Sequence, residues 1–243
     1  FKETDVKREN IFVQSKCGIV PGVMYDLSKK HILESVDGIL KRLDMEYLDA
    51  LVLHRPDALV EPEEVAAAFD ELEKSGKVCH FGVSNQKPMQ IELLKRYVKQ
   101  PIEINQLQLS IPCSNMITNG MEVNMASEGA VDRDGSVLDY CRLNDITIQA
   151  WSPFQYGFFE GVFIGNEEKY PKLNAVLNEL ADKYNVSPSG IATAWILRHP
   201  AGIQMIAGST SRKHMQEIID GSHVTLTREE WYRLYLAADH MLP

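Results

Sequence analysis

The stretch that decides the fold is Met205-Ile206-Ala207-Gly208-Ser209-Thr210-Ser211-Arg212-Lys213-His214. Its apolar start is typical of a buried strand, which ends at Gly208. Three hydroxyl residues then lead into a segment whose apolar residues have helical spacing. A strand, a turn of small residues and a helix start favour a bound anion, because free backbone N–H groups and the helix dipole attract negative charge. The same pattern is also typical of an ordinary capped loop. The rest of the chain has to decide between the two.

Outward from this stretch, apolar strand-like runs alternate with segments of helical period. Six strands are predicted, at Ile11–Cys17, Leu48–His54, Val78–Asn85, Ile102–Ser110, Ile146–Trp151 and Met205–Ala207. Helical periods of 10–15 residues between most of these runs imply parallel βαβ units. The strand cores lack strict polar–apolar alternation, so both faces of the sheet are expected to be covered.

Start and stop signals frame several of the predicted helices. Ser28 and Ser187 are expected N-caps, Pro62 is an expected first helical residue, and Thr227 with Glu230 forms an expected capping box. The stretch from Ile111 to Gly135 shows no helical or strand period and is predicted to be a long irregular loop.

Two architectures fit this alternation: an open doubly wound sheet and a closed (β/α) barrel. No strand is followed by G-x-G-x-x-G, which argues against a dinucleotide-binding open sheet. Polar residues end the strands, and in a barrel all strand ends meet at one mouth. These residues are Lys16, His54, Ser84 with Asn85, Gln106, Ser152 and Ser209. We therefore predict an α/β barrel, a single domain over residues 1–243 in which only about six βα units are present.

Charge and cysteine content exclude some classes of partner. The formal net charge is −9, from 34 acidic and 25 basic residues, which argues against general affinity for nucleic acid or anionic membrane surfaces. The four cysteines form no C-x-x-C pair, and no apolar run suits a membrane span or signal peptide. We expect a cytoplasmic protein with a small-molecule substrate, while the sequence leaves its oligomeric state open.

Several segments together resemble the aldo-keto reductase family, in particular its bacterial oxidoreductase subgroup. They are SKCG (15–18), LKRLDMEYLDALVLHRPD (40–57), GKVCHFGVSN (76–85), INQLQLS (104–110), AWSPF (150–154) and IAGSTSRKHMQE (206–217). The resemblance covers nearly the whole chain. It implies a (β/α)8 TIM barrel that uses NADP(H) to reduce carbonyl compounds.

Matching by motif, the resemblance implies that Lys16 is the catalytic lysine and His54 the catalytic histidine. It also implies a set of cofactor residues along the later strands. Ser84, Asn85 and Gln106 would bind the nicotinamide carboxamide, Trp151 would stack on its ring with Ser152 and Phe154 beside it, Gly208, Ser209, Thr210 and Ser211 would hold the adenosine phosphate, and Glu217 would face the adenine. His214 stands where the family often has Arg, so NAD(H) stays open beside NADP(H).

Each role has a plain structural alternative. Lys16 could be a strand-end lysine that reaches solvent, or a Schiff-base lysine as in barrel aldolases. His54 could be a core histidine bonded to backbone, and Trp151 could be core packing. Asn85 and Gln106 could bond only to the barrel backbone. For the reductase, a buried ammonium would lower the pKa of a neighbouring phenol, and a neutral imidazole would orient the carbonyl oxygen.

The family's general-acid Tyr and its Asp partner have no match in this sequence. We expect them ahead of Phe1, and Tyr25 or Tyr156 is the alternative acid. Two functions stay open: an NAD(P)H-dependent carbonyl reductase, and a noncatalytic nucleotide-binding or regulatory module. Phe154, Tyr156 and Phe158 indicate an aromatic pocket wall, which favours apolar aldehydes or ketones as substrates.

Overall fold

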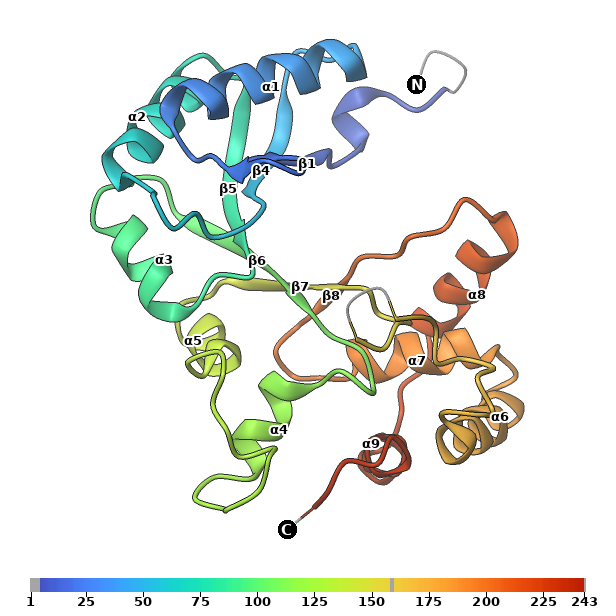
Figure 1. The fold of residues 1–243 in the computed structure, drawn as a ribbon. Helices are drawn as coiled ribbons and strands as arrows, with labels where there is room; N and C mark the ends of the chain where they lie inside the picture. The colour runs from blue at the N-terminus through green and yellow to red at the C-terminus, as the bar shows by residue number, and fades with distance from the viewer. Residues whose placement is uncertain (1–4, 158–159, 243) are drawn as a thin grey trace. The chain divides into compact units, whose positions relative to one another are not determined.

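The computed structural model describes residues 5–157 and 160–242. The chain divides into two compact units, Phe1–Asn105 and Gln106–Pro243. Each is built on parallel strands with helices beside them (Figure 1). The boundary between the units falls within strand β6 (Ile102–Gln108), so its first residues belong to unit 1 and its last residues to unit 2. The assignment of a single barrel domain to residues 1–243 stays a prediction.

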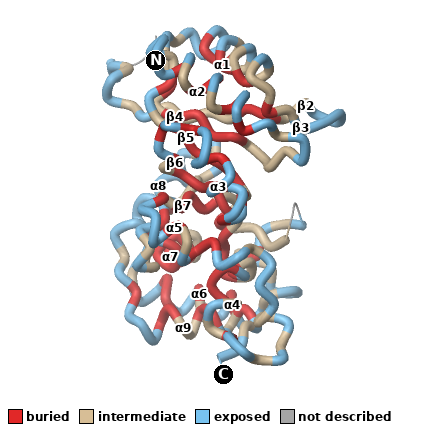
Figure 2. Tube along the Cα trace, turned by 90° about the vertical axis from the view of Figure 1, so that its left-hand side faces the viewer, coloured by how far each residue is buried: buried red, intermediate tan, exposed pale blue. Residues whose placement is uncertain are grey.

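Unit 1 holds a parallel sheet in the order β1-β4-β5-β6. Its other elements are β1 (Gln14–Cys17), the hairpin β2 (Ile19–Val20) and β3 (Met24–Tyr25), α1 (Lys29–Leu43), β4 (Leu48–Leu53), α2 (Pro62–Lys74), β5 (Val78–Ser84) and α3 (Pro88–Lys95), after a short 3-10 turn at Arg8–Asn10. Figure 2 shows the buried residues of this unit concentrated along the strands.

Both faces of the unit 1 sheet are packed. On one face Ala50, Val52 and Ile104 form a buried cluster. A Cβ on Gly82 would lie 2.7 Å from the Cβ of Ile104, so this close approach of β5 and β6 requires glycine. On a second face Phe81 of β5 stacks on Phe69 of α2, with ring centroids 4.1 Å apart. This confirms that the strands are covered on both sides.

The predicted caps of unit 1 are present. The Ser28 hydroxyl accepts the backbone N–H of His31 and begins α1, as expected. Pro62 is the first residue of α2, and Gly76 follows its end with φ of +70°. These signals are local, because each depends on a side chain and a backbone group within one helical turn.

The first strand is shorter than predicted and begins at Gln14 rather than Ile11. The Asp49 carboxylate accepts the Val13 N–H at 2.7 Å, and the same oxygen accepts Arg8 Nη2 at 2.7 Å. This side-chain network joins the residues ahead of β1 to the start of β4, and the Val13 carbonyl also accepts the backbone N–H groups of Asp49 and Ala50 at 2.9 and 3.2 Å. The hairpin β2–β3 was likewise not expected in the loop that follows Cys17.

Unit 2 carries β7 and β8 in parallel beside the second half of β6. Its elements are α4 (Asn115–Met121), α5 (Val137–Leu143), β7 (Thr147–Trp151), α6 (Pro171–Tyr184), α7 (Pro188–Leu197), β8 (Gln204–Met205), α8 (Arg212–Ser222) and α9 (Arg228–Ala237). Helix α4 corrects the irregular loop predicted between Ile111 and Gly135. It buries Met116 and Ile117, two apolar residues too few to produce a visible period.

Two tryptophans join α7 to α9. The indoles of Trp195 and Trp231 stack with centroids 4.7 Å apart, and each Nε1–H donates to the backbone carbonyl of the other residue at 3.1 and 3.0 Å. Buried indole N–H groups need such acceptors.

In the part of the chain that the structure describes, no helix has the length and apolarity to cross a bilayer.

The predicted capping box at the start of α9 is present and extends into a wider network. Glu230 is 4% exposed and accepts from the Thr227 N–H at 2.8 Å, from Lys183 at 2.5 Å and from the Tyr184 hydroxyl at 2.7 Å. Burial alone would raise the pKa of Glu230, but these hydrogen bonds lower it to about 2 from 4.5. The folded state therefore holds this carboxylate ionised.

We predict that Glu230→Gln destabilises the protein by about 2 kcal/mol near neutral pH, after allowance for the exposed Lys183 partner. Because the pKa of Glu230 is lower in the folded state, its ionised form stabilises the fold at pH values above the unfolded pKa of 4.5. This stabilisation is lost as the pH falls toward the folded pKa of about 2. Urea unfolding of both proteins at several pH values measures the difference. Glu229→Gln, an exposed neighbour, is the control and is expected to change little.

Candidate active site

Lys16 and His54 lie on adjacent parallel strands of unit 1. Lys16 pairs in register with Val52, and the His54 N–H donates to the Cys17 carbonyl at 2.8 Å just beyond the end of β4. Side chains alternate along a strand, so Lys16, Val52 and His54 fall on one face. Lys16 and His54 also line one cavity of about 240 Å³, whose other wall is α1. The structure thus brings the two predicted catalytic residues together.

The electrostatics of this pair are those of crowded, partly buried cations. Burial lowers the pKa of Lys16, and the Arg55 guanidinium lowers it further. Burial also lowers the pKa of His54, with added contributions from Lys16 and then Arg55. A lowered pKa favours the neutral imidazole, which can donate or accept a hydrogen bond at a substrate oxygen.

Two local interactions fix the conformation of the loops around Lys16 and His54. Gly18 has φ of +99°, and a Cβ there would meet the buried side chain of Leu27. The Asp57 carboxylate accepts the Leu27 N–H at 3.0 Å and the Leu59 N–H at 2.9 Å. The loops after β1 and β4 are therefore tied to each other through one side chain.

Ser84 and Asn85 follow the same pattern on the next strand. Leu53 pairs in register with Val83, so Ser84 comes level with His54 at the end of β5. Ser84 is buried, and its hydroxyl accepts Asn85 Nδ2 at 2.7 Å. Asn85 has φ of +55°, a left-handed conformation that asparagine tolerates and that turns its side chain out of the strand direction.

In unit 2 the structure corrects the placement of Gln106 at a strand end. Gln106 lies inside β6 and is 3% exposed. Its Nε2 donates to Oε1 of Gln149 on β7 at 2.8 Å, and Gln149 Nε2 donates to Gln204 on β8 at 3.1 Å. A polar ladder thus crosses three strands. Part of the hydrogen-bonding capacity of Gln106 serves the sheet.

Trp151, Ser152 and Phe154 form the end of β7 and the turn after it. The Leu109 N–H donates to the Trp151 carbonyl at 3.3 Å, and Ser152 has φ of +52°. The Phe154 carbonyl accepts the Phe163 N–H at 3.1 Å. Of the predicted aromatic wall, Phe154 is half-buried, whereas Phe158 lies outside the described residues.

Tyr156, one of the two alternative acids, is enclosed by its neighbours: Lys169 Nζ lies 3.9 Å from its ring centroid, and Tyr170 packs against it. Tyr25, the other, is 49% exposed on the hairpin strand β3.

The segment quoted first forms a turn and the start of α8. Strand β8 ends at Met205, before the predicted Ala207, although the Ile206 N–H still donates to the Ala150 carbonyl. Ser211 caps α8 by accepting the His214 N–H at 3.4 Å, and Ser209 Oγ accepts the Ser211 N–H at 3.1 Å. A Cβ on Gly208 would meet open space. The turn thus leaves room for an anion at a helix N-terminus, where the dipole favours negative charge.

The remaining predicted residues, Thr210, His214 and Glu217, lie just before α8 and on its first two turns. His214 lies 3.5 Å from Ser209 Oγ through its Nδ1, and Thr210 is exposed. Glu217 faces Lys213 at 3.9 Å, one helical turn away. The structure places these side chains around the same helix start.

The sequence profile described as "Aldo/keto reductase family" matches residues 1–237. The chain belongs to the aldo/keto reductase family.

The alignments with individual members of the family cover most of this chain and most of each relative. The oxidoreductase YcsN of Bacillus subtilis is 35% identical over 95% of this chain and 74% of its own length. A 6-dehydroglucose reductase of Agrobacterium fabrum is 31% identical over 95% and 73%. The crystal structure of a thermostable aldo-keto reductase in complex with epalrestat superposes with a TM-score of 0.73 at 25% identity, covering 96% of this chain and 73% of that one. These matches confirm the α/β fold class and correspond to part of an aldo-keto reductase barrel.

Two features of this aldo/keto reductase were not found from its sequence. The first is Arg55, whose charge lowers the pKa of both Lys16 and His54. Its position next to His54 in the segment HRPD is the sequence feature that could have indicated this role. The second is the contact of α7 with α8, where Gly190 and Gly221 meet backbone to backbone. A Cβ on Gly221 would overlap the Gly190 carbonyl. This pair fixes the depth at which α8 packs.

We predict that Gly221→Ala destabilises the protein by about 2 kcal/mol, because overpacking against backbone outweighs the gain in helix propensity. The measurement is the midpoint of urea unfolding. Gly38→Ala is the matched helical control. Its added Cβ meets the movable Arg42 guanidinium at 3.1 Å, and we expect no loss of stability. Equal effects of the two substitutions would contradict tight packing at Gly221.

Proposed function

We propose that this chain is an NADP(H)-dependent reductase of aldehydes or ketones, in which Lys16 and His54 support the proton transfer. The observation that carries the proposal is the pairing of these residues at adjacent strand ends, lining one cavity. In parallel α/β folds the carboxyl ends of strands are where catalytic side chains gather. Membership of the aldo/keto reductase family supports the same reaction class.

The residues of unit 2 support the nucleotide part of the proposal. NADP(H), when bound, would supply the hydride that adds to the carbonyl carbon. The turn at Gly208 to Ser211 would hold its phosphate through backbone N–H groups at the start of α8. Trp151, Ser152 and Phe154 would lie at its nicotinamide, together with Gln106 of the same unit. The resemblance assigns Ser84 and Asn85 of unit 1 to the nicotinamide carboxamide as well. A relative from Bombyx mori, 20% identical, was crystallised in complex with NADP.

Lys16 and His54 would act on charge and protons rather than on the hydride. Hydride addition turns the carbonyl oxygen into an alkoxide, which must gain one proton to become the alcohol. We propose that neutral His54 donates a hydrogen bond to this oxygen and that the Lys16 ammonium stabilises the conjugate base of the proton donor. The resemblance assigns that donor to the family's general-acid tyrosine, which has no match in this sequence, and Tyr25 or Tyr156 is the alternative within it.

The proposal is tested by mixing the purified chain with NADPH and an aromatic aldehyde and following loss of the reduced cofactor. Binding of NADPH is measured separately by its fluorescence. We predict that Lys16→Met lowers turnover by roughly a hundredfold or more while NADPH still binds. Lys41→Met, an exposed lysine of α1, is the control and is expected to leave both quantities unchanged.

Two results would each contradict one part of the proposal. Turnover retained in Lys16→Met would remove this lysine from the mechanism. Binding of NADPH without turnover by the parent chain would contradict reductase activity of this chain. It would favour the noncatalytic nucleotide-binding module, the second function that the sequence leaves open.

A further inference from the structure

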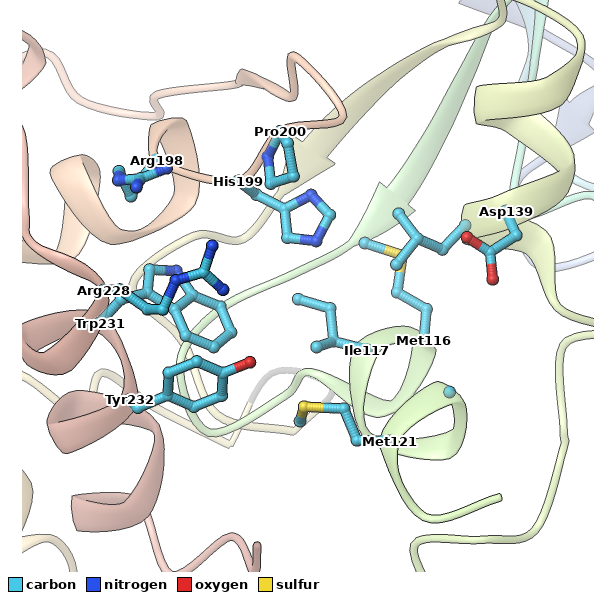
Figure 3. Close-up of a pocket in the computed structure, with 12 residues that line it drawn as sticks. Met116, Ile117, Met121, Asp139, Arg198, His199, Pro200, Arg228, Trp231 and Tyr232 are labelled. Atoms are coloured by element: carbon cyan, nitrogen blue, oxygen red, sulfur yellow. The ribbon is translucent and has the colours of Figure 1, made fainter. Parts of the chain in front are cut away.

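A second cavity lies wholly within unit 2 and is built from helices. It has a volume of about 360 Å³ and is lined by residues of α4, α5 and α9 and by the segment after α7. Its lining includes none of the predicted catalytic or cofactor residues. Figure 3 shows Trp231 and Tyr232 of α9 on one side and Met116, Ile117 and Met121 of α4 on the other. The volume is in the range of small-molecule sites.

The floor of this cavity is apolar. Met116, Ile117 and Trp231 are each less than a tenth exposed, and Met121 is half-buried. Thioether and indole groups form a soft, adaptable surface for a hydrocarbon chain or ring. At the rim, a Cβ on Gly120 would meet open space. An apolar group that enters here gains contact without displacing protein atoms.

Three polar groups line the cavity above this floor, and their hydrogen-bond donors are not used by other described residues. The Arg228 guanidinium and the Tyr232 hydroxyl have no ion pair or hydrogen bond within residues 5–157 and 160–242. His199 Nδ1 accepts the Ala201 N–H at 3.2 Å, so a neutral His199 carries its proton on Nε2. Figure 3 shows the Arg228 guanidinium and the His199 ring on the same side of the space.

The charge balance of the lining favours a monoanion. Arg198 and Arg228 are basic, and Asp139 is the acidic lining residue. Arg198 is held by donation from its Nε to the Leu226 carbonyl at 2.9 Å, which leaves its terminal nitrogens for other partners. A guanidinium binds a carboxylate through two parallel hydrogen bonds. A multiply charged phosphate would meet both Asp139 and the apolar floor.

We propose that this cavity binds an apolar monocarboxylate, with the carboxylate on Arg228 and His199 and the hydrocarbon part on Met116, Ile117 and Trp231. The site is independent of NADP(H) and of the proposed reduction. Because the occupant touches α4, the end of α7 and α9 together, its binding stabilises the folded form of unit 2.

The test is calorimetric titration of the full chain with hexanoate, with hexan-1-ol and inorganic phosphate as the neutral and the purely anionic probes. We expect hexanoate to bind at one site with a Kd of about 1 mM or tighter, and at least about tenfold more tightly than either probe. Arg228→Gln should weaken hexanoate binding about tenfold. Gly120→Phe should abolish it by filling the rim.

Arg96→Gln removes one exposed positive charge elsewhere and should leave hexanoate affinity unchanged. NADPH binding and circular dichroism in the same samples show that each variant is folded, so failure here is distinct from failure of the reductase proposal. Absence of hexanoate binding at about ten times the expected Kd would overturn the proposal. So would equal affinity for hexan-1-ol, or a loss of hexanoate affinity in Arg96→Gln as large as that in Arg228→Gln.

Discussion

The parallel pairing of β1 with β4 is the constraint on which the candidate active site depends. The hydrogen bond from the His54 N–H to the Cys17 carbonyl extends this pairing past the end of β4. Because side chains alternate along strands, a shift of one residue would turn Lys16 and His54 to opposite faces. The Arg8–Asp49–Val13 network holds the start of β1 against β4 and so helps to fix this register. Residues distant from the chemistry thereby set its geometry.

This juxtaposition has an electrostatic consequence. Lys16, His54 and Arg55 are cationic or can become so, and their closeness lowers the pKa values of Lys16 and His54 beyond the effect of burial. A protein normally avoids such crowding of like charges, and perturbed groups of this kind gather at functional sites. The cluster suits a site at which negative charge develops on a substrate. That is the requirement of carbonyl reduction.

The sequence was sufficient for features that depend on neighbours within a turn or on long periodic runs. The Ser28 cap, the first residue of α2 at Pro62 and the Thr227 capping box were all predicted correctly. Features that depend on distant partners were not. The bond from the Val13 N–H to the Asp49 carboxylate joins two segments that are distant in the chain, and the Gly190–Gly221 contact depends on how two helices pack. No local pattern records either.

The candidate site divides in the same way. Lys16 and His54 are polar residues at predicted strand ends whose catalytic roles the family resemblance implied, and the strand register brings them together. Gln106 followed the same rule, but its amide belongs to a ladder with Gln149 inside the sheet. The last residue of a strand cannot be predicted to within two positions when apolar and polar residues alternate up to its end. The role of Arg55 is visible only through its effect on two neighbours.

The most direct test of the account is an NMR titration of His54, with its resonance assigned by His54→Gln. If the Lys16 ammonium lies beside this imidazole, Lys16→Met removes a positive charge and the pKa of His54 rises, while Lys41→Met leaves it unchanged. An unchanged His54 pKa in Lys16→Met would contradict the juxtaposition on which the proposed reductase rests.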